Sequence, residues 1–548
     1  MKKTIMLLLL SSLILFENKK VMAEEKSQIY FLADPFKTLI LPQTNAITET
    51  MISDLQVLLA AGEYEAASFV IYAAEDLKNL ELKVSPLKND NKTLSKEAVD
   101  VRAVKCWYQS GHGAKLEKDK RLLVPELLLH DDDLVRVDYE KKENFLKNVI
   151  DKDQIEYVPI STATSEHLAN IRPLDAKQLL PITIQKNSSK QFWITIHTPP
   201  NTAPGIYKYT ISFNVKNTKL PTLNLSAHIL PFRLLETTET DEMISIFYRG
   251  RLNVNRQISI DTREKSPIQY VAEIENLKNH GIRYAPFYQT YNEQLLRNEI
   301  QMREKVGLTS QGLFLSCWAE RPSAEAARKW TKFLAPLGYP NVYFFEEPGV
   351  DYQQEKLVEK TARYKATREA GGKVFSWYCP AHVDDAMREQ IDLAIGPNPG
   401  EIEKIHRLRR KILRANLMPV DEQNIENFRR DHGLVRWQDK FDGVLCYCYQ
   451  DHCRGHAWND FDSSTRGFLY TYPTIDGVVD TLCWEAFREG IDDVRYLKTL
   501  IQAINNAPVQ KQQIAHEARE WINRLNAKKC ILAETRAEIT KWILKLNQ

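Results

Sequence analysis

The feature that most constrains the fold of this chain is a change of hydrophobic pattern near residue 240. Beyond it, short apolar segments alternate with longer stretches in which apolar residues recur every three or four positions. Buried strands and amphipathic helices have these two patterns, and their alternation builds parallel sheets. The eight strand–helix units predict a (β/α)8 barrel of the TIM type. The predicted strands are residues 243–248, 282–287, 312–316, 341–346, 373–378, 392–396, 412–416 and 443–449.

The part before residue 240 has a different pattern, in which β-branched and aromatic runs are separated by Gly, Pro, Asn or Asp. Residues 67–72, 192–196 and 207–211 are examples, and these runs are typical of an antiparallel sandwich. The sequence therefore predicts a multi-domain fold, an N-terminal β-sandwich followed by the barrel and C-terminal helices. The sandwich could support the barrel or bind sugar. Because the segments near residues 392 and 412 are weak, a distorted or incomplete barrel also stays open.

The predicted domain boundaries begin with a signal peptide at residues 1–23. Two lysines precede an apolar run at residues 5–16, and small residues end the segment. The run is shorter than the ~20 residues that a spanning helix needs, so we expect export to the periplasm or medium, with no stable membrane span. An uncleaved anchor is the alternative. The sandwich is placed at residues 24–238, the barrel at 239–484 and a helical segment packed on the barrel at 485–548.

Charge and cysteine content exclude several classes of function. Lys and Arg total 74 against 72 for Asp and Glu, so the formal net charge of +2 gives no field that would attract nucleic acid. A cluster of Cys446, Cys448, Cys453, His452 and His456 is superficially similar to a metal site, but no second Cys-x-x-Cys pair completes it. Alternation along a strand would place both Cys446 and Cys448 on one face. We therefore predict no metal and no cofactor.

Two adjacent carboxylates, Glu346 and Glu347, follow the fourth predicted strand. Catalytic groups of such barrels lie at the carboxyl ends of strands, and ionised carboxylates are disfavoured in a dry interior, so we expect both to face a polar cavity. Sequence neighbours at a strand end diverge, which makes them a poor pair for flanking a glycosidic bond. One could protonate a leaving oxygen while the other orients a substrate acetamido group that attacks as nucleophile. Ion pairs with basic residues at a loop are the structural alternative.

Aromatic residues near the predicted carboxyl ends are candidates for substrate binding. Flat rings stack on the apolar faces of sugars, while Tyr hydroxyls and Trp indoles supply hydrogen bonds. Core packing is the alternative role for part of this set. The preferred surface residues within it are Trp318, Tyr378, Tyr449 and Trp458. The full set is Tyr288, Trp318, Trp377, Tyr378, Tyr447, Tyr449 and Trp458.

Several segments along the chain occur in the order expected for one known family. Residues 62–69 (GEYEAASF) come first, followed by Trp193 with residues 204–207 (PGIY). Residues 472–477 and the block at 485–497 (EAFREGIDDVRYL) follow near the C-terminus. Together these segments resemble glycoside hydrolase family 123 and the broader group that shares its catalytic domain. The charged residues 488–493 are interpreted as a structural network, since Arg pairs bidentately with carboxylates.

The resemblance implies β-N-acetylgalactosaminidase activity by substrate assistance, in which a Glu is the acid and a preceding Asp holds the acetamido group. At the matching positions Glu347 takes the general acid/base role, and Glu346 stands where the family has Asp and would orient the acetamido group. The predicted function is retaining cleavage of β-linked N-acetylhexosamine from a glycan. A carbohydrate-binding or scaffold protein with an inactive barrel is one alternative. A two-carboxylate glycosidase acting on sugars without an acetamido group is the other.

Overall fold

The structure is a computed structural model. It describes residues 27–32, 34–45, 54–89, 92–110, 120–151, 154–216, 218–255, 260–308, 313–316, 318–346, 354–377, 385–396, 399–416, 424–451, 456–459, 461 and 468–547. The predicted signal peptide at residues 1–23 lies outside these ranges, as do Glu347, Tyr378, His452 and Cys453.

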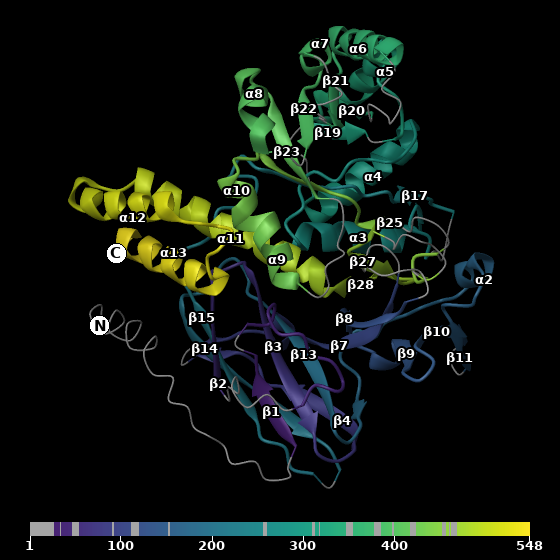
Figure 1. The fold of residues 1–548 in the computed structure, drawn as a ribbon, viewed down its shortest axis with the longest axis vertical. Helices are drawn as coiled ribbons and strands as arrows, with labels where there is room; N and C mark the ends of the chain where they lie inside the picture. The colour runs from purple at the N-terminus through teal and green to yellow at the C-terminus, as the bar shows by residue number, and fades with distance from the viewer. Residues whose placement is uncertain are drawn as a thin grey trace.

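The N-terminal part contains two sheets that share one apolar core (Figure 1). Neighbouring strands pair antiparallel in both sheets, except for the parallel pair of β15 and β2. The first sheet has the order β1 (Gln28–Phe31), β3 (Tyr64–Ala73), β13 (Ser188–His197), β7 (Val99–Gln109), β8 (Leu122–Leu129), β28 (Val478–Thr481), β27 (Thr471–Pro473). The second has the order β12 (Ile182–Ile184), β4 (Leu77–Val84), β14 (Gly205–Asn214), β15 (Leu223–Ile229), β2 (Asp54–Leu59). A small sheet of β9 (Val135–Asp138), β10 (Glu143–Asp151) and β11 (Gln154–Pro159) lies beside them.

The two sheets differ in how many of their faces are covered. Strand β14 alternates between buried and exposed residues, with Tyr207 and Tyr209 in the shared core and Lys208 outside. Strands β3 and β13 of the first sheet are buried along most of their length. In β13, Ile194 packs in the sandwich core, whereas Trp193 packs with residues of the helices and parallel sheet. The first sheet is therefore a layer between the second sheet and the C-terminal half. Because both of its faces are covered, its strands do not alternate between buried and exposed residues.

Strands β27 and β28 belong to the first sheet although they come from the C-terminal part of the chain. Residues 471–481 were placed in the barrel domain, but β28 pairs with β8 through Asp480 opposite Leu128 and Thr481 opposite Leu127. The Arg102 guanidinium lies 2.6 Å from Asp480 and fixes the same junction. A pairing between segments more than three hundred residues apart leaves no local signal in the sequence, which explains the difference.

The second half contains a sheet of parallel strands in the predicted order. It runs β16 (Met243–Ile246), β24 (Gly443–Cys446), β23 (Lys411–Asn416), β22 (Leu393–Gly396), β21 (Lys373–Trp377), β20 (Asn341–Phe345), β19 (Leu313–Ser316). Within this sheet, the last strand in chain order, β24, thus pairs with the first, β16. The predicted strand at residues 282–287 forms isolated parallel bridges to both edges, Ser245 with Tyr284 and Phe287 with Ser316. The weak segments near 392 and 412 are genuine strands.

Helices between these strands start at the side-chain caps that their sequences supply. Helix α3 (Pro267–Asn279) is capped by Ser266, α4 (Glu293–Val306) by Asn292 and α5 (Ala324–Leu334) by Ser323, each accepting a backbone N–H two or three residues into the helix. Helix α4 ends at Gly307 in the left-handed conformation. The remaining helices on this side include α6 (Gln354–Glu369), α7 (Asp385–Arg388), α8 (Ile402–Arg407), α9 (Ile425–Arg430) and α10 (Arg436–Gln438).

The C-terminal helices join the two halves. They are α11 (Leu482–Asn505), α12 (Gln512–Arg524) and α13 (Leu532–Asn547), and in Figure 1 they lie between the sandwich below and the parallel sheet above. Helix α11 begins three residues earlier than predicted, because Thr481 caps it. Most of its first sixteen residues are buried on every side, so it is a central element rather than an outer layer.

Two further findings concern the chain as a whole. Among the described residues, none of the helices combines the length and the apolar character required to span a bilayer. The described cysteines Cys106, Cys446, Cys448, Cys483 and Cys530 are all free thiols. Within the described parts of the chain, stability therefore depends on core packing and on polar contacts.

Candidate functional site

The carboxyl ends of the parallel strands meet at one edge of the sheet, where catalytic residues of such folds gather. Several predicted residues follow these ends. Tyr288 follows the bridging segment, Trp318 follows β19, Trp377 ends β21 and Tyr447 follows β24. The structure thus brings together the parts of the sequence that were expected to form a site.

An aromatic cluster forms the floor of this edge. Tyr288, Trp377 and Tyr447 belong to it, together with Phe247 and Phe345. The ring of Phe247 lies 5.3 Å from that of Phe345 and 5.5 Å from that of Tyr447, both in edge-to-face contact. Tyr288 is 9% exposed, and Trp377 and Tyr447 are half-buried. Such a floor offers flat apolar surfaces with a few polar atoms, which suits a ligand with both apolar and hydroxylated faces.

Trp318 differs from the other members of the predicted set because it is exposed. Its side chain is 56% accessible, and its ring contacts Phe345 edge-on at 5.4 Å. Its backbone has φ of 60°, a left-handed conformation that is rare for a bulky residue and that clusters at functional sites. Trp318 therefore presents an uncovered aromatic face beside the strand that leads to the two carboxylates.

A charged pair that the sequence analysis missed lies in the same place. The Arg249 guanidinium forms an ion pair with Asp451 and donates a 3.3 Å hydrogen bond to the Tyr447 hydroxyl, which itself donates to Asp451 at 2.5 Å. Burial alone would lower the pKa of Arg249, but Asp451 holds it above its usual value. Residues Arg249 and Asp451 follow the ends of β16 and β24. Their positions after predicted strands were the available signal, but a lone Arg and a lone Asp gave no local motif.

Glu346 is described and takes part in an ion pair. Both of its carboxylate oxygens accept from Nη2 of Arg363 on α6, at 2.6 and 2.8 Å, and its side chain is 14% exposed. Its backbone carbonyl accepts from Ser376 at 2.5 Å. Phe345, the residue before it, faces the aromatic floor. Glu346 therefore points to the helix layer, as alternation along a strand requires, and not over the aromatic floor.

Two of the seven predicted aromatic residues belong to the core. Tyr449 is fully buried and donates to Asn276 at 3.0 Å, and Trp458 is 1% exposed and donates to the Pro473 carbonyl at 2.9 Å. Their prediction as surface residues was wrong, because strand β24 ends at Cys446 and the chain beyond it packs both rings against residues of the first sheet. Four others lie at the edge of the sheet: Tyr288, Trp318, Trp377 and Tyr447. The seventh, Tyr378, lies outside the described residues.

The cysteine cluster does not behave as the alternation predicted. Cys446 packs among residues between the sheet and the helices, whereas Cys448 packs in the aromatic floor and donates to the Phe247 carbonyl at 2.9 Å. The two thiols face different surroundings because the strand stops between them. Burial raises the pKa of Cys446 to about 12, so this thiol stays protonated and is a poor ligand.

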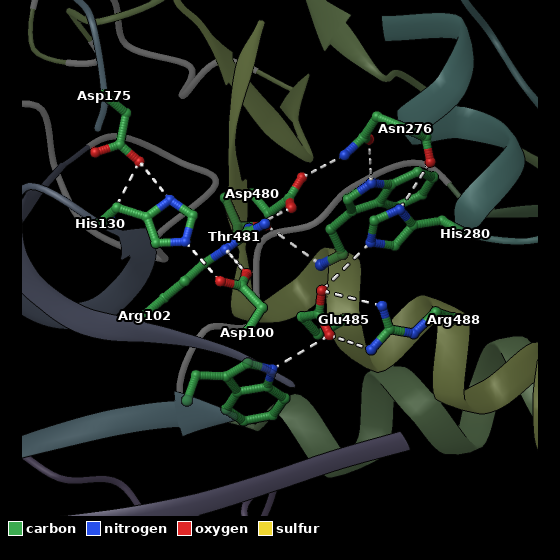
Figure 2. Close-up of polar contacts among 12 residues, drawn as sticks. Asp100, Arg102, His130, Asp175, Asn276, His280, Asp480, Thr481, Glu485 and Arg488 are labelled. Carbon is green, nitrogen blue, oxygen red and sulfur yellow. Dashed lines mark hydrogen bonds and ion pairs between the residues drawn. The ribbon is translucent and has the colours of Figure 1, made fainter. Parts of the chain in front are cut away.

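A second group, His280, Asp480 and Glu485, brings three possible metal ligands together between the sandwich and α11 (Figure 2). Each of the two carboxylates is already paired with an arginine. Arg102 lies 2.6 Å from Asp480, and Arg488 forms an ion pair with Glu485. Burial alone would raise the pKa of Glu485, but Arg488 lowers it to about 2. These residues fit a buried, charge-balanced junction rather than a cation site.

The charged block at the start of α11 is the structural network that the sequence predicted. Asp493 accepts two 2.8 Å hydrogen bonds from Arg429 on α9 and is also bound by Arg536 on α13 at 2.7 Å. Arg536 further contacts Glu489 at 2.7 Å and Glu65 of β3 at 3.0 Å. The network thus ties α9, α11, α13 and the sandwich together, and it lies away from the aromatic edge.

Comparison with known proteins agrees with this architecture. Residues 60–215 match the family model described as the glycoside hydrolase 123 N-terminal domain. No curated protein matches the sequence significantly. Among solved structures, a family 123 glycoside hydrolase from Clostridium perfringens aligns with a TM-score of 0.63 at 11% identity, covering 95% of this chain and 97% of that chain. At this identity the alignment shows a shared fold.

Two other solved structures align less well. A GH5 xyloglucanase from Bacteroides ovatus has a TM-score of 0.27 at 9% identity, over 80% of this chain and 98% of that chain. An N-acetylneuraminate lyase from Fusobacterium nucleatum has a TM-score of 0.27 at 11% identity, over 56% of this chain and 98% of that chain. Neither similarity is strong enough to bear on function.

The sandwich recognised by the family model and the fold shared along nearly the whole chain define the class of protein, a glycoside hydrolase. Residues 60–215 match the N-terminal domain of glycoside hydrolase family 123, and nearly the whole chain shares its fold with an enzyme of that family. The resemblance drawn from the sequence motifs is confirmed.

Proposed function

We propose that this glycosidase hydrolyses β-linked N-acetylhexosamine, with N-acetylgalactosamine as the expected sugar. The observation that carries the proposal is the aromatic floor at the carboxyl edge, beside the strand end after which Glu347 follows. Its rings suit the apolar face of a pyranose, and the nearby polar groups suit its hydroxyls. The Clostridium perfringens structure concerns glycolipid glycan hydrolysis, which supports a glycolipid glycan as the substrate class.

The proposal includes a closed (β/α)8 barrel. Its support is the parallel pairing of β16 with β24, together with the isolated bridges that join the segment near residue 284 to both β16 and β19. Closure would place all eight carboxyl ends around one mouth, so that residues from distant strands could contact a single sugar. Trp318 would stack on that sugar, and the Arg249–Asp451 pair would hold its hydroxyl groups.

The proposed mechanism uses the substrate's acetamido group as the nucleophile. Glu347 would donate a proton to the glycosidic oxygen while the acetamido oxygen attacks the anomeric carbon, and the leaving alcohol departs. Glu347, now a carboxylate, would then accept a proton from the water that opens the cyclic intermediate. Two inversions at the anomeric carbon give net retention, and no cofactor enters either step.

For Glu346, the contact of both carboxylate oxygens with Nη2 of Arg363 favours a supporting role, in which it anchors the end of β20. The role predicted from the family pattern, orientation of the acetamido group, requires its oxygens to leave Arg363. The variants Glu346→Gln and Arg363→Gln separate the two roles. If Glu346 supports the strand end, both variants should lower kcat to a similar extent; if it orients the acetamido group, Glu346→Gln should be much the more severe.

The decisive test compares chromogenic β-glycosides with and without the 2-acetamido group. We expect hydrolysis only of the acetamido sugars, and we expect Glu347→Gln to lower kcat by about 10²- to 10⁴-fold, the usual contribution of a general acid. Glu369→Gln is the matched control, because Glu369 is an exposed residue at the far end of α6. Unchanged activity of Glu347→Gln would remove Glu347 from the mechanism.

The same experiment separates the alternatives. Hydrolysis of sugars that lack the acetamido group would favour a two-carboxylate glycosidase. Binding without hydrolysis across a broad glycan panel would favour a carbohydrate-binding protein with an inactive barrel. We also propose that the protein is exported after removal of residues 1–23, and N-terminal sequencing of the mature protein tests this.

A further inference from the structure

A cavity that shares no residue with the aromatic edge lies where the sandwich, the end of α3 and helix α11 meet. Its volume is about 360 Å³. The sandwich contributes Tyr64 and His197, the end of α3 contributes Lys278 and His280, and α11 contributes Arg488 and Arg495. Most of these side chains are basic or can donate hydrogen bonds. The cavity is thus formed by three elements and is not used by the glycosidase site.

The acidic groups around this cavity already have partners. Asp492 accepts from Arg495 at 2.7 Å, and Glu236 lies 3.4 Å from Arg283 and 3.5 Å from Arg495. Glu485, just behind the lining, forms an ion pair with Arg488. Figure 2 shows Arg488 and His280 both against this carboxylate. These carboxylates are therefore paired with arginines. They do not take up the remaining hydrogen-bond donors of the cavity.

Three donors at the cavity have no hydrogen-bond partner among the described residues. Nε of Arg488 is unpartnered although the side chain is only 5% exposed. Lys278 is exposed in the last turn of α3 and forms no ion pair within the described ranges. The His197 ring stacks on Tyr64 at 3.8 Å, and its nitrogens have no hydrogen-bond partner in the same ranges. A buried, unpartnered guanidinium N–H is costly unless a ligand or water satisfies it.

The electrostatics of the cavity agree with this arrangement. Burial lowers the pKa of His197, and the positive charges of Arg488 and Lys278 lower it further. Arg488 and Lys278 place two positive charges beside the His197 ring, and these charges make a positive contribution to the local potential. A small oxyanion would be attracted by this potential and could accept from Arg488, Lys278 and His197 at once.

We propose that this cavity binds a small oxyanion through Arg488, Lys278 and His197, and that the bound anion joins the sandwich to helices α3 and α11. The expected ligand carries a sulfate, a phosphate or a carboxylate group, all of which accept several hydrogen bonds. Such a group could be a free inorganic ion or the acidic substituent of a sugar. The site is independent of the glycosidase mechanism, because none of its residues lies at the aromatic edge.

The test is calorimetric titration of the full-length protein at constant ionic strength, balanced with sodium chloride. Three probes are used: sodium sulfate, sodium phosphate and methyl β-D-glucuronide. We expect saturable binding of at least one probe. Binding of the inorganic ions alone would assign a free-anion site, and binding of the glucuronide as well would assign a site for acidic sugars.

Two variants locate the site. Lys278→Gln and His197→Gln should each weaken binding by about threefold to tenfold, because each removes one donor of a solvent-accessible site. Lys305→Gln is the matched control, since Lys305 is an exposed lysine in the last turn of α4 and does not line the cavity. The proposal is overturned if no probe binds saturably, or if Lys278→Gln and His197→Gln bind as tightly as the unmodified protein.

Discussion

The aromatic edge and the buried end of α11 differ in how they use charge. At the α11 junction, carboxylates and arginines are numerous, and Asp493 alone is contacted by two arginines. At the aromatic edge the polar groups are few, and they lie beside half-buried rings and one exposed tryptophan. The richest cluster of charge is therefore a structural joint. The candidate site is marked instead by aromatic surface that nothing in the described chain covers.

The comparison teaches that pairing, and not the number of charges, separates the two regions. A buried ion network costs desolvation energy and persists only when each charge is matched. A binding site must keep donors or faces available for its ligand. The following predictions test whether the two regions separate in this way, since one should respond in stability and the other in activity.

The largest effect is expected at the α11 junction. Arg536→Met leaves Asp493, Glu489 and Glu65 short of a cation, so the free energy of unfolding should fall by about 3–5 kcal/mol. Chemical denaturation followed by circular dichroism measures this. Lys541→Met on the same helix is the control and should cost less than ~1 kcal/mol, because Lys541 is 41% exposed. Equal losses in both variants would contradict the network.

Trp458→Ala should have an effect nearly as large. Trp458 is 1% exposed and packs against Trp107 and Tyr472, with ring centroids 6.1 and 4.9 Å away. The cavity left by the indole should lower the free energy of unfolding by about 3–5 kcal/mol. Thermal or urea unfolding of the variant checks this. A small loss of stability together with a large rise in KM would show that Trp458 binds substrate and is not a core residue.

Trp318→Ala should show the opposite behaviour. Its exposed ring contributes little packing, so the stability should change by less than ~1 kcal/mol. The loss of a stacking face should lower kcat/KM by about tenfold to a hundredfold on the acetamido glycoside. Steady-state kinetics and a melting curve give both values. An unchanged kcat/KM would mean that the exposed indole does not contact substrate.

The last expected effect depends on pH and comes from Glu63, which is buried beside the α11 junction. Burial, with a further contribution from Asp492, raises the pKa of Glu63 to about 8. In the unfolded chain this carboxyl ionises near its ordinary pKa, so the folded protein binds the extra proton over the interval between the two values. The stability that Glu63 contributes is therefore fully present at low pH. It is lost as the pH rises from about 5 to about 8.

The variant Glu63→Gln removes this titration. The slope of unfolding free energy between pH 5 and 8 should become shallower by up to about 1.4 kcal/mol per pH unit. Urea unfolding across this range measures the slope. Glu166→Gln, at an exposed position of α2 (Ser165–Ala169), should leave the profile unchanged. An unaltered slope for Glu63→Gln would show that Glu63 is ionised in the folded protein.

Much of the fold could be predicted from local patterns. The alternation of apolar strands and amphipathic helices gave the order of the parallel sheet, including the two weak strands near residues 392 and 412. The position of β27 and β28 could not be predicted, because their partner β8 is hundreds of residues away and pairing energy depends on contact in space. The predicted domain boundaries, including the one at residue 484, stay a prediction.

The candidate site was predicted in part. Tyr288, Trp377 and Tyr447 meet at the edge because each follows or ends a strand, and strand ends can be found from sequence. Tyr449 and Trp458 were misplaced because the strand ends at Cys446 and the following chain packs them against residues of the first sheet. The Arg249–Asp451 pair was missed because its members follow the first and last strands of the parallel sheet and are about two hundred residues apart in the sequence.

The sequence by itself determined the strand–helix alternation, the caps that start the helices and the motifs of the family, because these depend on residues close together along the chain. Only the tertiary structure decided which aromatic rings are covered and which charges are matched. Burial and pairing depend on what packs against a side chain from elsewhere in the molecule. Glu346 illustrates this: its position after β20 was evident from sequence, but its partner Arg363 appeared only when α6 packed beside that strand.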